Sequence, residues 1–229
     1  MRAVRWRLLP EERLVMYSPV WFRPIDAFTG LPPVESLRVR LDLALDGGWV
    51  ATDIKPVTTP SGAIVYPGLG RHREPLTAQP RRYRARFESD AFLAVYRRDR
   101  DGLEFTAPLY NDTNPPSALA MPVTVELLPS LRYPFPAGVP ILRGRVVTAA
   151  GAPVVDAQVE AQLQPGPVLR LERTMTQGQG GFGLPVRWPV PNVPVVVLAT
   201  DLRAQPNRAG AITVQFPGAF GQSHTITVS

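Results

Sequence analysis

Alternation between apolar and polar side chains runs through most of the chain. Leu37–Leu43 alternates apolar with charged residues without interruption, and the same period of two recurs at Tyr83–Phe87, Val123–Leu127 and Val155–Leu163. A period of two places successive side chains on opposite faces of a β-strand. Each of these segments is therefore predicted to be a strand with one face toward a core and the other toward water.

Three more strands are predicted in the last third of the chain. Pro194 precedes a continuous apolar run, Val195–Leu198, which is typical of a strand buried on both faces. Period-two spacing returns in Ile212–Phe216, and Thr225–Val228 predicts a last strand. Since no window of eleven or more residues keeps an apolar stripe at helical spacing free of proline, very little helix is expected.

Glycine and proline separate these strands and divide the chain. The 27 prolines suit strand ends, edges and turns. Four of them lie in Pro129–Pro140, which favours an extended connector. The sequence thus predicts an all-β fold of two β-sandwich domains (transthyretin/Ig-like). We expect a first sandwich with an N-terminal arm in residues 1–130, a Pro-rich linker in residues 131–140 and a second sandwich in residues 141–229.

The second of these domains carries a recognisable order of motifs. A strand with a central glycine is followed by a G-x-P turn, a second strand and, about twenty residues later, a glycine-rich turn before F-x-L. These motifs are Leu142–Val146, Ala150–Pro153, Asp156–Val159 and Thr176–Leu184. The segment resembles a carboxypeptidase regulatory-like domain, a transthyretin-like β-sandwich, although Asp156 stands where that family has glycine and Gln177 where it has aspartate. The resemblance implies the fold and an accessory, non-catalytic role.

The first domain contains a possible diverged copy of the second. Asp26–Pro32 precedes the strand from Leu37 much as the Gly151 turn precedes the strand from Val155, and Thr59–Tyr66 echoes Thr176–Leu184. A duplicated unit leaves this kind of self-similarity. The alternative is that unrelated sandwiches share the same turn residues, and the sequence alone leaves both open.

The net charge of +6 rests almost entirely on arginine, because Lys55 is the only lysine. If Tyr83 and Phe87 face the core, then Arg82, Arg84 and Arg86 form an outward strip, a candidate partner-binding site suited to carboxylates or phosphates. Exposed aromatic residues that stack on bases are missing from the strip, which argues against single-stranded nucleic acid. A solvated face or salt bridges to an acidic protein partner is the favoured interpretation.

The side chains that reactions require are scarce. The chain has no cysteine, and its two histidines, His72 and His224, have neither a second histidine nor a carboxylate at ligand spacing. No nucleophile elbow or phosphate-binding loop motif occurs. We therefore expect no catalytic residues, no metal and no cofactor, and predict that the protein is not an enzyme.

The first thirty residues combine basic and aromatic side chains. The apolar stretch ends at Leu9, which is too short for a signal peptide, and no segment is long enough to span a membrane, so a cytoplasmic location is expected. Trp6, Trp21 and Phe22 are candidate partner-binding residues of an arm, because aromatic residues are enriched at interface cores. An ordinary first pair of strands is the alternative.

These observations favour a structural or adaptor subunit of a multi-subunit assembly, whose partners are other protein subunits, including further copies of itself. Sandwiches of this kind occur in phage-tail-like and contractile injection particles, which we take as the expected setting by analogy of fold. The alternative is a carbohydrate- or surface-binding module that uses Trp49, Trp188 and Tyr66. A third possibility is an accessory domain separated from its enzyme.

Overall fold

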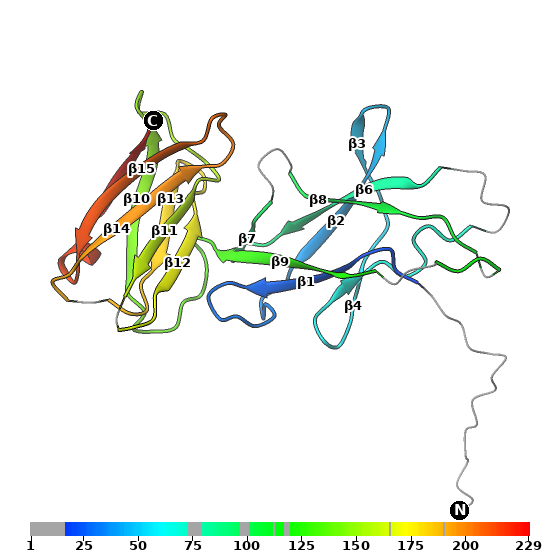
Figure 1. The fold of residues 1–229 in the computed structure, drawn as a ribbon, viewed down its shortest axis with the longest axis horizontal. Coiled ribbons are helices and arrows are strands. Elements are labelled where there is room, and N and C mark those ends of the chain that lie inside the picture. Colours follow the sequence, from blue (N-terminus) through cyan, green and yellow to red (C-terminus); the bar gives the residue numbers. More distant parts are fainter. Residues whose placement is uncertain are drawn as a thin grey trace, which may run out of the picture.

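The computed structural model describes residues 17–72, 79–96, 101–111, 113–116, 120–164, 166–189 and 191–229. Apart from the short 3₁₀ helix η2 (Gly218–Gly221), the regular elements of these residues are β-strands (Figure 1). The all-β prediction is confirmed. In Figure 1 the strands of residues 17–129, the first half, run across those of residues 141–229, the second half.

The first half is one strongly curled sheet. Its strands are β1 (Trp21–Asp26), β2 (Arg38–Leu45), β3 (Gly48–Ala51), β4 (Val57–Thr58), β5 (Ile64–Val65), β6 (Arg81–Glu88), β7 (Phe92–Ala94), β8 (Leu103–Ala107) and β9 (Pro122–Pro129). Their order is β3-β2-β6-β7-β9-β1-β5-β4, with β8 also paired to β6. The sheet encloses a core that includes Phe22, Leu41, Tyr66, Phe87 and Leu127.

The second half is a sandwich of two sheets. Its strands are β10 (Ile141–Thr148), β11 (Gln158–Leu163), β12 (Arg170–Met175), β13 (Gly181–Pro185), β14 (Pro194–Asp201), β15 (Arg208–Gln215) and β16 (Ser223–Val228). One sheet has the order β13-β10-β16 and the other β12-β11-β14-β15. Between them lies a second, separate core that includes Leu142, Phe182, Val197, Phe216 and Ile226.

The two halves share one strand topology. In the second half β10 pairs parallel with β16 and antiparallel with β13, as β1 pairs parallel with β9 and antiparallel with β5. The antiparallel ladder β12-β11-β14-β15 likewise corresponds to β3-β2-β6-β8. Strands β4 and β7 are additions to the first half. This shared topology supports a proposal that the halves arose by duplication.

The turn glycines agree with the same correspondence. Gly62, before β5, has φ +79°, and Gly180, before β13, has φ +76°. Both adopt the left-handed conformation that glycine reaches without a steric penalty. By backbone conformation, Gly62 of the first half and Gly180 of the second half are therefore equivalent. Asp156 also has a positive φ of 60°, a conformation that aspartate tolerates better than most residues.

Two sequence predictions on strands need correction. Val195–Leu198 is not buried on both faces: β14 alternates, and the side chain of Val196 is 56% exposed, because the outer face of its sheet is not covered by other described residues. The strand predicted from Val155 begins only at Gln158, since the left-handed turn at Asp156 interrupts the extended backbone.

Gly144 marks the tightest approach in the second half. It lies in the middle of β10, opposite His224 of β16 and Phe182 of β13. A Cβ atom built at this position would lie 2.4 Å from the His224 carbonyl oxygen and 2.6 Å from Cζ of Phe182. The central glycine of this strand therefore makes room for a neighbouring backbone and an aromatic ring.

The stretch 131–140 contains no strand, but it packs against the first half. Tyr133 and Phe135 contact the ring of Phe28, with centroid separations of 5.5 and 5.3 Å. The Tyr133 hydroxyl donates a 2.7 Å hydrogen bond to Oδ2 of Asp26, a buried carboxylate. This connection is therefore anchored by contacts of its own side chains, and the division into two domains stays a prediction.

Candidate functional site

The predicted arginine strip lies on the outer face of the first half. Tyr83, Ala85 and Phe87 point into the core, at 4%, 0% and 6% exposure, so the alternating Arg82 and Arg84 are turned outward together with Arg86. Strand β6 is flanked by β2 on one side and β8 on the other. The partners of the three arginines come from those two strands.

The three arginines of the strip are all paired with carboxylates of the same chain. Nε and Nη2 of Arg84 both donate to Oδ2 of Asp42, at 3.0 and 2.8 Å. Nε of Arg86 donates to the same oxygen at 2.8 Å, and Nη2 of Arg86 donates to Oδ1 of Asp42 at 2.9 Å. Arg82 forms a 2.7 Å ion pair with Glu104, and the ring of Trp49 lies 4.8 Å from Cζ of Arg84. Salt bridges do occupy the strip, but their carboxylates belong to this protein rather than to a partner.

Asp42 is the centre of this network. Its side chain is only 2% exposed although it lies on the outer face of β2, because Arg84 and Arg86 cover it. Burial raises the pKa of Asp42, but the hydrogen bonds from Arg86 and then Arg84 outweigh burial and hold this pKa below its usual value. The hydrogen bond to Asp42 correspondingly raises the pKa of Arg86. The network ties β2 to β6.

We expect Asp42→Asn to lower the free energy of unfolding by about 2 kcal/mol at pH 7, because two arginines lose a charged acceptor. Since the folded-state pKa lies below the unfolded value of about 3.9, this contribution is complete above pH 3.9 and is lost as the pH falls through the folded pKa. Urea unfolding at several pH values measures it. Asp90→Asn, at a 90% exposed carboxylate, is the control and should leave the free energy of unfolding unchanged. A destabilisation by Asp42→Asn that stays equally large at acidic pH contradicts the assignment.

The predicted aromatic partner residues separate in the structure. Phe22 is 1% exposed and packs edge-on against Phe87 and Phe105, at 5.3 and 5.8 Å between centroids. It belongs to the core, so the prediction that it contacts a partner is corrected. Trp21, the neighbouring residue on β1, faces outward and is 41% exposed. Trp6 lies outside the described residues.

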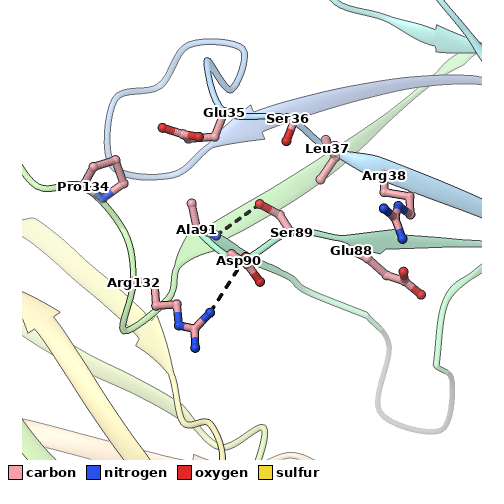
Figure 2. Close-up of a pocket in the computed structure, with 10 residues that line it drawn as sticks. All are labelled: Glu35, Ser36, Leu37, Arg38, Glu88, Ser89, Asp90, Ala91, Arg132 and Pro134. Carbon is pink, nitrogen blue, oxygen red and sulfur yellow. Dashed lines mark hydrogen bonds and ion pairs between the residues drawn. The ribbon is translucent and has the colours of Figure 1, made fainter.

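A polar hollow of about 660 Å³ opens beside the connection between the halves (Figure 2). Glu35, Arg38, Glu88, Asp90 and Arg132 supply its charges, and Ser36 and Ser89 its hydroxyl groups. The contacts drawn across it are a 3.8 Å ion pair between Arg132 and Asp90 and a 3.2 Å hydrogen bond that the Ala91 amide donates to Ser89. No histidine is among its lining residues in the described part of the chain.

Within the residues that the structure describes, no group of three or more His, Cys, Asp or Glu side chains is placed to hold a metal ion. Nor does this part of the chain contain a helix long and apolar enough to cross a membrane.

The three aromatic residues named for carbohydrate binding do not form a common platform. Tyr66 is 1% exposed, and its hydroxyl lies inside the first core. Trp49 is covered by Arg84, and the guanidinium groups of Arg187 and Arg170 lie over the ring of Trp188, at 4.6 and 5.0 Å from its centroid. Trp49 and Trp188 belong to different halves, so no observation favours the carbohydrate-binding alternative.

The contact between the halves was missed by sequence reasoning. Arg187, just after β13, binds the buried carboxylate of Glu172 through Nε and Nη2, at 2.7 and 2.9 Å, and donates through Nη1 to the carbonyl oxygen of Phe28 in the first half. Its guanidinium also lies 4.7 Å from the ring of Phe28. A carboxylate on the inward side of a strand, as Glu172 is on β12, was the one available signal.

Other side chains also make contacts between the halves. Arg173 of β12 forms a two-hydrogen-bond ion pair with Glu126 of β9. The hydroxyl of Thr174 donates to the carbonyl oxygen of Pro129 at 2.9 Å, and Arg203 pairs with Asp101 at 3.1 Å. The end of β9 is thus fixed against the edge strand β12 by side chains of both halves.

Comparisons with known proteins assign no family. No family model and no curated protein matches the chain. Three solved structures show weak similarity. The Bacillus anthracis TIE protein is 8% identical, with a TM-score of 0.29, over 93% of this chain and 33% of that protein. A Streptococcal ancillary pilin is 9% identical, with a TM-score of 0.31, over 93% of this chain and 62% of the pilin.

The third is BcpA, the major pilin subunit of Bacillus cereus, which is 9% identical with a TM-score of 0.27 over 93% of this chain and 69% of the pilin. This chain therefore spans between one third and about two thirds of the length of these proteins. TM-scores below 0.5 mean that the overall arrangements differ, so the matches assign no function, and the resemblance to carboxypeptidase regulatory-like domains stays a prediction.

Proposed function

We propose that the protein is a non-catalytic structural or adaptor subunit of a multi-subunit assembly. The observation that supports this most directly is the way in which the two halves are fixed to each other. Arg187 joins a carboxylate of the second half to a backbone carbonyl of the first, and the Glu126–Arg173 and Asp101–Arg203 pairs are further contacts between the halves. Halves held by several separate contacts keep one relative orientation, which a spacer or connector requires.

The surface chemistry supports the same function. The arginines of the outer strip are held by carboxylates of their own chain, and a face stiffened in this way suits a load-bearing part better than one that must rearrange around a ligand. The finer setting that we propose is a phage-tail-like or contractile injection particle assembled in the cytoplasm. This step is an analogy with other uses of such sandwiches, since fold alone does not determine function.

The experiment is to express a tagged chain at its natural level in its source cells and to measure its sedimentation in a gradient after gentle lysis. The proposal expects the protein in a large complex, well above the 25.1 kDa of one chain. Recovery only as a free single chain overturns it. A large complex found on the cell surface supports a structural subunit and rejects the particle setting.

A further inference from the structure

An apolar cleft lies at the end of the first half where β1 begins. Its volume is about 320 Å³, and no charged side chain is among its lining residues in the described part of the chain. The lining includes Tyr17, Trp21, Val65, Leu69, Pro108 and Tyr110. Rings, prolines and branched aliphatic side chains make a surface that takes up apolar side chains from an extended segment.

The cleft wall is held in place by several contacts. The rings of Tyr17 and Tyr110 meet edge to face at 5.6 Å, and the Tyr110 hydroxyl donates to the carbonyl oxygen of Tyr17 at 3.3 Å. That carbonyl also accepts a 2.8 Å hydrogen bond from the amide of Gly68. Tyr110 is buried, whereas Trp21 keeps 41% of its surface exposed. The cleft is thus a built concavity with one aromatic side chain left partly uncovered.

Residues 1–16 precede Tyr17 of this wall in the sequence and carry a matching pattern. Val4, Trp6 and Leu8 alternate with Arg5 and Arg7. In an extended conformation this spacing puts the three apolar side chains on one face and both arginines on the other. An uncharged cleft can accept the apolar face and leave the arginines in water.

We propose that Val4, Trp6 and Leu8 of one copy dock in the cleft of a second copy, so that copies are linked by exchange of their first residues. The inference rests on the proposed function and names one of the contacts of the assembly. Sixteen extended residues span about 50 Å, which is enough to reach a neighbouring molecule.

The composition of the segment favours a neighbour over the same chain. Tyr17 is itself part of the cleft wall, so a segment that fills its own cleft must reverse direction between Leu9 and Met16. That stretch contains Pro10 but no glycine, asparagine, aspartate or serine, the residues that otherwise dominate tight reversals. An outward course to a second copy requires no such reversal.

The test is sedimentation velocity of the full chain over a range of concentrations. We expect the wild-type mass to rise above 25.1 kDa with concentration, and both Trp6→Ala, in the segment, and Trp21→Ala, in the cleft, to weaken association at least thirtyfold. Arg7→Ala, on the opposite face of the segment, is the matched control and should associate like the wild type. Unchanged circular dichroism of the Trp21→Ala chain shows that it is folded.

Mixing the two defective variants distinguishes exchange from docking within one chain. A Trp6→Ala chain keeps its cleft and a Trp21→Ala chain keeps its segment, so an equimolar mixture should form pairs of about 50 kDa, twice the chain mass. A synthetic peptide of residues 1–10 should dissociate wild-type assemblies, and its Trp6→Ala version should not. If all variants associate equally, the exchange is overturned and the proposed function still stands. The same holds if the purified wild type is monomeric but joins a large complex in cells.

Discussion

Arg187→Met is expected to lower the free energy of unfolding by about 3 to 5 kcal/mol, the usual cost of removing one partner of a buried ion pair. Glu172 is 2% exposed and would lose the two hydrogen bonds that Nε and Nη2 of Arg187 donate to its carboxylate, while the first half would lose a bond to the Phe28 carbonyl. Urea unfolding at pH 7, followed by tryptophan fluorescence, measures the change.

Two further variants make this expectation specific. Arg170→Met removes the other guanidinium over Trp188 and should cost less than about 1 kcal/mol, because such exposed cation–π contacts are weak. The double variant Glu172→Leu with Arg187→Met removes the stranded carboxylate and should recover part of the stability. A single Arg187→Met chain as stable as the wild type, or a double variant less stable than the single one, contradicts the role given to the pair.

Gly144→Ala is expected to destabilise the protein by about 3 kcal/mol, at the upper end of what overpacking costs. The added methyl group would lie 2.4 Å from a backbone oxygen of β16 and 2.6 Å from the ring of Phe182, neither of which can withdraw without opening the sheet or the core. The measurement is again the urea midpoint at constant slope.

Gly183→Ala supplies the control for this substitution. Gly183 lies on the neighbouring strand β13, and its added Cβ would meet Ile141 at 3.4 Å and Leu131 at 3.5 Å, which are ordinary contacts. We expect a change of less than about 0.5 kcal/mol. Equal effects of the two substitutions would show that loss of glycine flexibility, rather than the close approach at Gly144, sets the cost.

The strands were predictable because each half buries one face of its sheets. The faultless alternation of Leu37–Leu43 gave β2 its faces, and the turn glycines Gly178 and Gly180 lie between β12 and β13. Val196 was wrongly placed in a core, since an apolar run does not reveal that the outer face of its sheet is uncovered.

The contacts that organise the surface depend on residues far apart in the chain. Alternation assigns Asp42 to the solvent side of β2, and only the pairing of β2 with β6 brings Arg84 and Arg86, more than forty residues later, over it. Arg187 likewise meets Phe28 across 159 positions. No local pattern encodes such pairs, whereas the strip of three arginines on one face of β6 followed directly from their spacing.

The parallel pairing of β10 with β16 determines how the second half would respond to tension. Six residues of β10, Arg143–Thr148, lie beside six of β16, Ser223–Val228, in the same direction. The beginning of β10 and the end of β16 are therefore at opposite ends of the ladder. A pull applied to those two points loads the backbone hydrogen bonds of the β10–β16 ladder in shear. The bonds then share the force and must break together instead of one after another.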